Sequence, residues 1–187
     1  MDNKKTTDKD DAATIQAFYE EKLLVLAERL AVEQQADVGR AAAFAVAPHH
    51  GQKYNRLCGS RMTVGFWLQP AVAGDAVRLG RVLFQPESCL LGRVAAALCE
   101  QTLRGETWGG VKLLRQLLAD LLAGRRDDLP APYQPFACFA AVRYLQQRHS
   151  AILLPLDVIL ESWHNNSNGA SDEKSNGIDN PQMESDR

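Results

Sequence analysis

Apolar residues follow two different periods along the chain, and the change of period divides it into helical and extended segments. Spacings of three and four residues over residues 12–35 predict an amphipathic helix. The short apolar run at 41–47, ended by a Pro-His-His-Gly turn, predicts an edge strand. Strand-like runs at 62–68 and 76–84, separated by a loop rich in Pro, Gly and Asp, predict an antiparallel hairpin.

The second half of the chain has helical periods. Apolar positions from residue 89 to the Arg-Gly pair at 104–105 predict one helix. A broad leucine face at 111–123, followed by Gly124, predicts a second helix that stops at this glycine. A polar loop is expected at 125–135, and the helical period of 136–163 predicts a last helical region that Pro155 kinks or divides.

This order of elements predicts the fold class and the limits of the domain. A helix, a small sheet and then several helices indicate an α+β fold, with an antiparallel sheet of about three strands and the helices packed on one of its faces. We expect a single domain at residues 12–163. The flanking segments 1–11 and 164–187 are polar and almost free of large apolar residues, so we expect both to be disordered.

Composition and charge exclude several classes of function. With 187 residues, 45% of them apolar, the chain is long enough for one domain with its own core. A formal charge of -2 with dispersed basic residues argues against a nucleic-acid partner. The polar N-terminus has no apolar signal region, and charged residues interrupt the longer apolar runs. We therefore expect a cytoplasmic protein without a membrane anchor.

The cysteines are the residues with the most reactive chemistry. Cys99 and Cys138 lie inside apolar helical runs, which predicts core positions. Cys58 directly precedes the first hairpin strand, and Cys89 joins the second strand to its helix. At a helix N-terminus the unpaired N–H groups and the positive end of the helix dipole favour a thiolate, which binds metals and attacks sulfur. With His149, these two thiols could form a dispersed metal site, although no CxxC or HxxxH pair forces a common ligand set.

Local sequence around these residues resembles the NifU/IscU/SufU family of iron–sulfur cluster assembly scaffolds. Cys58-Gly59-Ser60-Arg61-Met62 is similar to the family's Cys-Gly-Asp segment, which a strand hairpin follows, and Cys89 is placed like its second cysteine. Arg148-His149-Ser150 resembles the family's third site, where a basic residue or histidine precedes the third cysteine. The resemblance covers roughly residues 18–163, and its spacing is closer to the SufU branch.

Two departures from the family pattern reduce the number of expected ligands. The family's aspartate is Ser60 here, and its third cysteine is Ser150. A serine hydroxyl stays protonated near neutral pH, and its hard oxygen suits iron or zinc less well than sulfur does. The resemblance therefore implies Cys58, Cys89 and His149 as ligands, with Ser60 and Ser150 as spectators or weak ligands.

The resemblance implies a scaffold rather than an enzyme, and no oxyanion-hole motif accompanies the thiols. A cysteine desulfurase would deliver sulfur to a thiolate, iron would enter the same site, and a [2Fe–2S] cluster would pass to acceptor apo-proteins. Iron alone or zinc are alternative cargoes. Two other functions remain open: a sulfur-acceptor or zinc-binding modulator of a desulfurase that holds no cluster, and a degenerate helical interaction module.

Overall fold

The computed structural model describes residues 21, 25–26, 39–56, 58–69 and 75–169, with the side chains of 165–169 left out. Most of the helix predicted at 12–35 and the predicted tail 1–11 lie outside these residues, as does segment 170–187 of the other predicted tail. Within the first of these segments Glu21, Val25 and Leu26 are helical, and Leu26 packs against the core.

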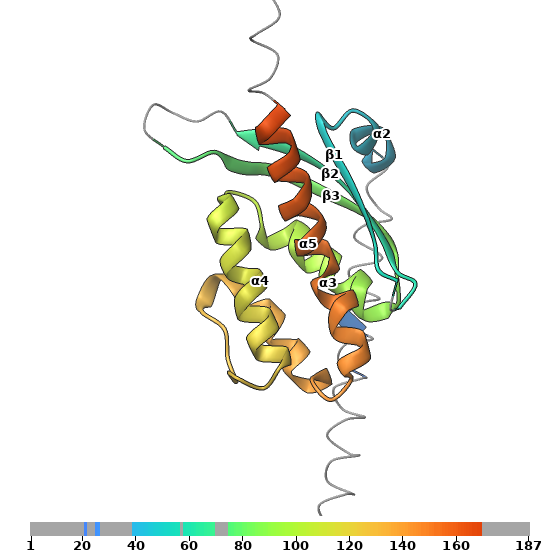
Figure 1. The fold of residues 1–187 in the computed structure, drawn as a ribbon, viewed down its shortest axis with the longest axis vertical. Helices are drawn as coiled ribbons and strands as arrows, with labels where there is room; N and C mark the ends of the chain where they lie inside the picture. Colours follow the sequence, from blue (N-terminus) through green and yellow to red (C-terminus); the bar gives the residue numbers. More distant parts are fainter. Residues whose placement is uncertain (1–20, 22–24, 27–38, 57, 70–74, 170–187) are drawn as a thin grey trace, which may run out of the picture.

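The described chain has an α+β architecture (Figure 1). Three antiparallel strands lie in the order β1-β2-β3, and helices α3, α4 and α5 gather on one side of this sheet. In chain order the elements are α2 (Arg40–Ala45), β1 (His49–Tyr54), β2 (Arg61–Gln69), β3 (Arg78–Glu87), α3 (Leu90–Thr102), α4 (Trp108–Leu122), the 3-10 helix η1 (Ala131–Val142) and α5 (Gln146–Gly169). The sequence prediction of the fold class is confirmed.

The first strand lies later in the chain than predicted. The alanine-rich segment expected to be an edge strand is instead helix α2, and β1 occupies the Pro-His-His-Gly segment expected to be a turn. Alanine has the strongest helix propensity, whereas β1 is a polar strand held by its pairing with β2 from His49↔Phe66 to Tyr54↔Arg61. The prediction of a strand at 41–47 is therefore wrong.

The predicted hairpin is confirmed as β2 and β3, and its second strand runs further than expected. β3 continues through Pro86 to Glu87, where the sequence indicated an end at residue 84. Because β3 is an edge strand, a residue without an N–H costs it little. The longer strand brings Glu87 opposite Arg61, and these two side chains form an ion pair at the end of the sheet.

The two faces of the sheet are covered differently. Met62, Val64 and Phe66 of β2 are fully buried and belong to the main core, which α3 and α5 also line. On the opposite face, a Cβ added to Gly65 would lie 3.0 Å from the Cβ of Ala47 and 3.4 Å from ring carbons of Phe44. The short α2 therefore packs where β2 has no side chain, and the expectation that all helices lie on one face is wrong for α2.

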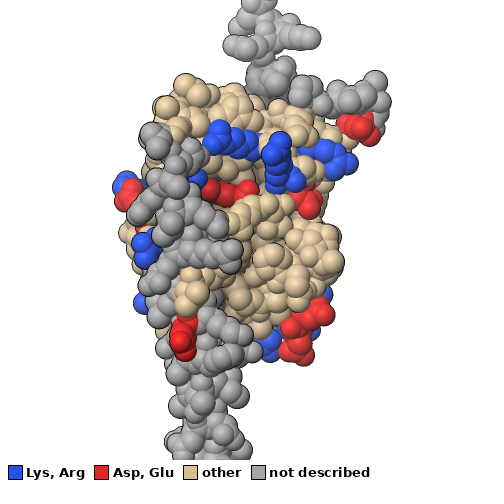
Figure 2. Space-filling view, turned by 180° about the vertical axis from the view of Figure 1, so that it is seen from behind, with Lys and Arg blue, Asp and Glu red and all other residues tan. Residues whose placement is uncertain are grey.

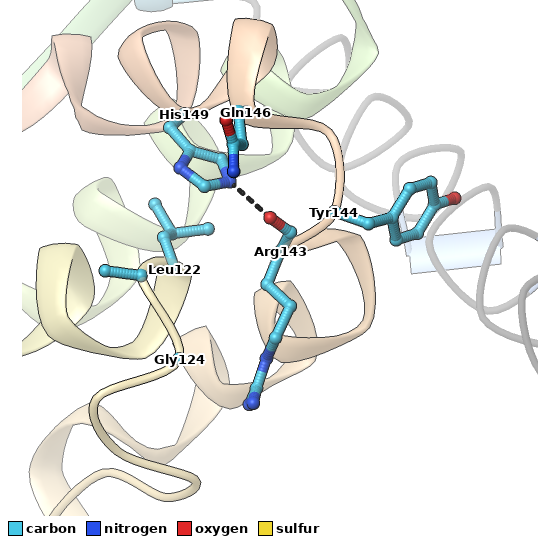
Figure 3. A pocket seen from close by; sticks show the side chains of 7 residues that line it. Leu122, Gly124, Arg143, Tyr144, Gln146 and His149 are labelled. Carbon is cyan, nitrogen blue, oxygen red and sulfur yellow. Dashed lines mark hydrogen bonds between the residues drawn. The ribbon is translucent and has the colours of Figure 1, made fainter.

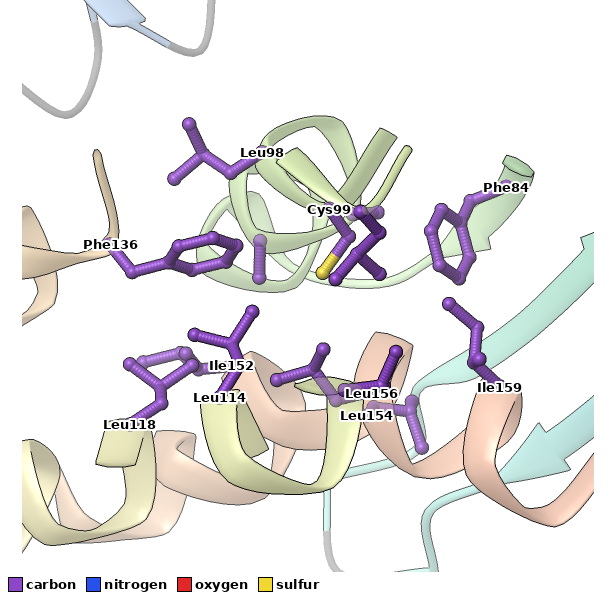
Figure 4. Packing of buried hydrophobic residues seen from close by; sticks show 14 of the residues in the cluster. Phe84, Leu98, Cys99, Leu114, Leu118, Phe136, Ile152, Leu154, Leu156 and Ile159 are labelled. Carbon is purple, nitrogen blue, oxygen red and sulfur yellow. The ribbon is translucent and has the colours of Figure 1, made fainter. Parts of the chain in front are cut away.

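The core lies between the sheet and the three longer helices (Figure 4). Phe84 of β3, Leu114 of α4, Phe136 of η1 and Ile152 of α5 all belong to this cluster, and each is at most 1% exposed. Cys99 lies in the same cluster with no exposed surface, and Cys138 packs against it half-buried. The prediction that these two cysteines are core residues is confirmed.

Two helix boundaries differ from the predictions because local effects override the apolar pattern. α4 begins three residues early, at Trp108, since the Thr107 hydroxyl accepts a hydrogen bond from the Gly110 N–H at 3.1 Å and caps the helix. Such a cap contributes about 1 kcal/mol, which offsets part of the poor helix propensity of the two glycines that follow Trp108. Gly124, with φ of 71°, ends α4 as predicted.

The last helical region divides at a different place from the one predicted. It breaks between η1 and α5, at residues 143–145, and α5 then runs through Pro155 and beyond the predicted boundary at 163 to Gly169. A proline within a helix removes the N–H that would bond the carbonyl four residues earlier, here that of Ala151. This carbonyl faces α3, where it would lie 3.2 Å from a Cβ at Gly92.

Both signs of charge appear on the face turned away from Figure 1 (Figure 2). Lys and Arg side chains gather near its upper end with acidic side chains directly beside them, and a large uncharged area lies below. The half-buried Arg40 of α2 pairs with Glu100 of α3 and also donates to the Phe84 carbonyl at 2.7 Å. The ion pair connects α2 to α3, and the hydrogen bond to Phe84 connects α2 to the edge strand β3.

Among the described residues, no helix combines the length and the apolarity needed to cross a membrane.

Candidate functional site

Three separate elements meet at the end of the sheet where β2 begins and β3 ends. The turn between β1 and β2 carries Cys58 and Ser60, the junction of β3 and α3 carries Ser88 and Cys89, and the first turns of α5 carry Ser150. We call these five residues the rim cluster.

A tight turn directs Cys58 to this end of the sheet. The N–H of Asn55 bonds to the carbonyl of Ser60 at 2.8 Å, and the N–H of Gly59 bonds to the carbonyl of Asn55 at 2.9 Å. Gly59 has φ of 70°, a left-handed conformation that side-chain-bearing residues rarely adopt. Gly59 is therefore a structural requirement of the turn that leads into β2, and the turn places Cys58 beside it at the end of the sheet.

A chain of hydrogen bonds links the thiol to the neighbouring strand. Cys58 Sγ lies 3.2 Å from Ser60 Oγ, and the Ser88 hydroxyl donates to Ser60 Oγ at 3.0 Å. Ser60 is only 3% exposed, so its hydroxyl depends on these protein partners. When Cys58 is ionised, the Ser60 hydroxyl turns its proton to the sulfur while it still accepts from Ser88.

The surroundings of Cys58 favour its thiolate form. Partial burial raises the pKa of the thiol, but hydrogen bonds from Ser60 and Ser150 and the charge of Arg148 outweigh burial and leave that pKa below its ordinary value. Ser150 and Arg148 both belong to the first turns of α5, about ninety residues further along the chain. The structure thus brings Ser60 and Ser150 to Cys58, as hydrogen-bond partners.

Cys89 occupies the N-cap position of α3, as the sequence predicted for the start of a helix. Its side chain is half-buried and makes no capping hydrogen bond. The preceding residue, Ser88, donates a hydrogen bond to Ser60. Arg61, which follows Ser60, pairs in the sheet with Glu87, which precedes Ser88. Cys58 and Cys89 therefore lie at the same end of the sheet, on either side of the last pair of β2 and β3.

His149 faces a different environment from its neighbour Ser150. Its Nε2 lies 2.9 Å from the backbone carbonyl of Arg143, to which it donates when that nitrogen is protonated. The ring lines a pocket of about 430 Å³ between the end of α4 and the start of α5, with Leu122 and Gly124 on the opposite wall (Figure 3). The hydrogen bonds to Cys58 therefore come from Ser60 and Ser150, not from His149. That His149 is a metal ligand stays a prediction.

Sequence analysis did not identify Ser88 and Arg148 as members of this site. Arg148 belongs to the Arg148-His149-Ser150 segment, and Ser88 directly precedes Cys89, but a serine before a cysteine and an arginine before a histidine are ordinary surface residues by pattern. The strand register would have revealed Ser88, because the pairing of Arg61 with Glu87 brings their neighbours Ser60 and Ser88 together. The register was not predictable because the pairing shifts at Trp67 and Leu68, and a shift of one residue changes every partner after it.

Other charged and polar groups near α3 and α4 have structural partners. The Tyr133 hydroxyl donates to Glu106 at 3.1 Å, and burial together with the negative charge of Glu106 raises the pKa of Tyr133 to about 12. Arg115 of α4 bonds to Asp157 of α5 at 2.8 Å. These contacts join η1, α4 and α5 and lie apart from the rim cluster.

No protein-family model matches the chain, and no curated protein matches it significantly by sequence. Solved structures do match its fold. The N-terminal part of a nitrogen-fixing NifU-like protein from Brucella abortus is similar with a TM-score of 0.56 and 18% identity, over 64% of this chain and 78% of that one.

A candidate iron–sulfur cluster assembly scaffold protein for the SUF system, from Fervidobacterium islandicum, is similar with a TM-score of 0.52 and 19% identity. That match covers 63% of this chain and 81% of the other. A hypothetical protein matches at a TM-score of 0.54 and 13% identity, over 61% of this chain and 79% of its own. At these identities the likeness is one of fold, and the chain therefore has a NifU/IscU/SufU-type fold.

Proposed function

We propose that this protein acts in iron–sulfur cluster assembly as a scaffold rather than an enzyme, accepting sulfur and iron through Cys58 and Cys89. The observation that supports the proposal is the placement of two half-buried cysteines, from different elements, at the same end of the sheet in a chain with a NifU/IscU/SufU-type fold. The partners would be a cysteine desulfurase as donor and apo-proteins as acceptors of the assembled cluster.

Cys58 is suited to the sulfur-accepting step. In this step the Cys58 thiolate attacks the terminal sulfur of a persulfide on the desulfurase. The sulfur–sulfur bond of the donor breaks, a new one forms at Cys58, and the donor cysteine leaves as a thiolate. A hydroxyl from Ser60 and the positive charge of Arg148 both favour the attacking anion.

Holding iron makes a greater demand on the site. A [2Fe–2S] cluster is usually held by four cysteine thiolates, with histidine replacing some of them in certain proteins. Among the described residues, no three His, Cys, Asp or Glu side chains are grouped as a metal site. Cys58 and Cys89 would be the thiolate ligands. His149 would join them only through a rotated ring or its other nitrogen, and Ser60 and Ser150 would be weak oxygen ligands at most.

Anaerobic reconstitution with iron and sulfide tests the scaffold proposal. We expect a visible chromophore with stoichiometric iron and sulfide in the wild-type protein, lost in Cys58→Ser and in Cys89→Ser. Cys138→Ser is the matched control, because it changes a cysteine that packs against the core, and it should keep the chromophore. A protein that stays colourless and iron-free would rule out the scaffold role.

The serines favour a second function, that of a sulfur acceptor or zinc-binding modulator of a desulfurase that holds no cluster. Hydroxyl groups donate hydrogen bonds to a sulfur anion more readily than they replace thiolates on iron, and two of them contact Cys58. Under this alternative, persulfide forms on the protein in the presence of a desulfurase although reconstitution yields no chromophore. The two assays together therefore separate the two functions.

A further inference from the structure

A groove between α4 and α5 lies outside the rim cluster. It consists of two adjoining pockets of about 620 and 570 Å³ that share Trp108 and Leu160. Leu113 and Lys112 of α4 border the first pocket, and His164 of α5 borders the second. We call these five residues the α4–α5 groove.

The groove exposes apolar surface beside positive charge. Trp108 and Leu113 are 38% and 52% exposed, and both border the first pocket, so their apolar surface is contiguous there. The Lys112 ammonium lies 5.2 Å from the centre of the Trp108 ring. An acidic segment with a few apolar side chains would match such a surface, because it can cover the indole and pair with the ammonium.

The acidic residues nearest the groove have other partners. Glu161, which lines the second pocket, forms an ion pair with Lys53 of β1. Asp157, one turn earlier on α5, bonds to Arg115. Arg115 also lines the first pocket, so positive and negative charges offset each other in both pairs. The Lys112 ammonium beside Trp108 is then the charge of the groove that favours an acidic segment.

A segment with this chemistry follows α5 directly. Residues 170–187 contain five acidic and two basic side chains, a net charge of -3, together with Ile178 and Met183. α5 ends at Gly169, only five residues beyond His164. Eighteen residues reach up to about 60 Å when extended, so the segment has ample length to turn back along α5 to Trp108.

We propose that residues 170–187 dock in the α4–α5 groove of the same chain. Because the segment is tethered beside the groove, its effective concentration is roughly millimolar. With an intrinsic dissociation constant of about 0.1 mM, the groove would then be occupied in about ten of every eleven molecules. A partner protein with a similar acidic and apolar segment must displace this one. Residues 170–187 therefore lower the apparent affinity of the groove for such a partner. The inference does not depend on the proposed role of the cysteines.

Paramagnetic broadening in the full-length protein tests this docking. A nitroxide is attached at Asn180→Cys in a Cys58→Ser, Cys89→Ser background, and the indole N–H signals of Trp108 and Trp67 are compared. Trp67 lies on β2, on the outer side of the sheet next to Arg81. We expect the label to broaden the Trp108 signal much more than that of Trp67 at low salt. The broadening should largely disappear at 1 M salt, where the Debye length falls to about 3 Å.

Two controls make the result decisive. A variant with the five acidic residues of 170–187 changed to amides should lose the selective broadening of Trp108, although tether and label are unchanged. Mixing spin-labelled chains with unlabelled ¹⁵N chains should leave Trp108 sharp. Equal broadening of Trp108 and Trp67, insensitivity to the amide changes, or broadening that appears between chains would each overturn the proposal.

Discussion

Replacing Gly92 with alanine should disturb the rim cluster through its packing. Gly92 lies in the first turn of α3, where a Cβ would lie 2.0 Å from Ser88 Oγ, 2.9 Å from Ser88 Cβ and 3.2 Å from the Ala151 carbonyl oxygen. Rotating the Ser88 hydroxyl relieves the first contact but breaks its bond to Ser60. The second contact involves a Cβ that the backbone fixes, so the junction of β3 and α3 must shift. The third contact requires the starts of α3 and α5 to move apart by a few tenths of an ångström.

The magnitude follows from three contributions. Alanine is more favourable than glycine within a helix by up to about 1 kcal/mol. Against this, loss of the bond to the buried Ser60 hydroxyl costs about 1–3 kcal/mol, and overpacking typically costs another 1–3 kcal/mol or so. We therefore expect Gly92→Ala to lower the free energy of unfolding by roughly 2 kcal/mol or more.

Urea unfolding followed by circular dichroism measures this change. Gly109→Ala in the first turn of α4 is the matched control, because its Cβ would meet only Thr107 Oγ1, at an ordinary 3.7 Å. That control should be neutral or slightly stabilising. Adding Ser88→Ala to Gly92→Ala removes the 2.0 Å contact and should recover part of the loss. A Gly92→Ala protein as stable as the Gly109→Ala control would refute the reasoning.

Three further predictions concern the thiols. Ser60→Ala removes a hydroxyl that stabilises the Cys58 thiolate, so the pKa of this thiol should rise and its alkylation at pH 7 should slow several-fold. Mass spectrometry of the Cys58 peptide over a pH series measures this, and a midpoint that does not move to higher pH would contradict it. Burial raises the pKa of the Cys99 thiol, and that of Cys138 to about 12, so both should resist alkylation until the protein unfolds. Early labelling of either would contradict their burial. Ser150→Cys adds a third thiol beside Cys58 and should tighten Zn²⁺ binding by on the order of tenfold or more in competition with a chromophoric chelator. Cys89→Ser should reverse this gain, and a gain that survives it would exclude Cys89 as a ligand.

The strongly periodic segments of the fold were predictable from sequence. The helix after Cys89 and the hairpin before it combine clear periods with enough apolar surface to require burial, so pattern and structure agree. β1 gave no such signal because it is polar and is stabilised by its partner strand. The alanine run that forms α2 has the length and polarity of either a short helix or a strand, and the helix propensity of alanine together with the packing against Gly65 favours the helix.

For the site, sequence analysis identified the junctions but not how the side chains meet. Cys58 and Cys89 were recognisable because each lies at a change of period. Whether Ser60 and Ser150 act as ligands or as hydrogen-bond donors depends on their position relative to a sulfur atom, and a pattern does not contain that distance. His149 illustrates the same limit, since its ring bonds to a carbonyl while the next residue contacts Cys58.

The most direct test of the proposed role is to follow sulfur from a cysteine desulfurase to a particular residue of this protein. After incubation with the enzyme and ³⁵S-labelled cysteine, persulfides are blocked by alkylation and the labelled peptides are identified. The account predicts label on the Cys58 peptide and none on the Cys99 or Cys138 peptides. The label should fall sharply in Cys58→Ser but not in Cys138→Ser. A protein that takes up no sulfur, or takes it up equally well without Cys58, would contradict the claim that this end of the sheet receives sulfur.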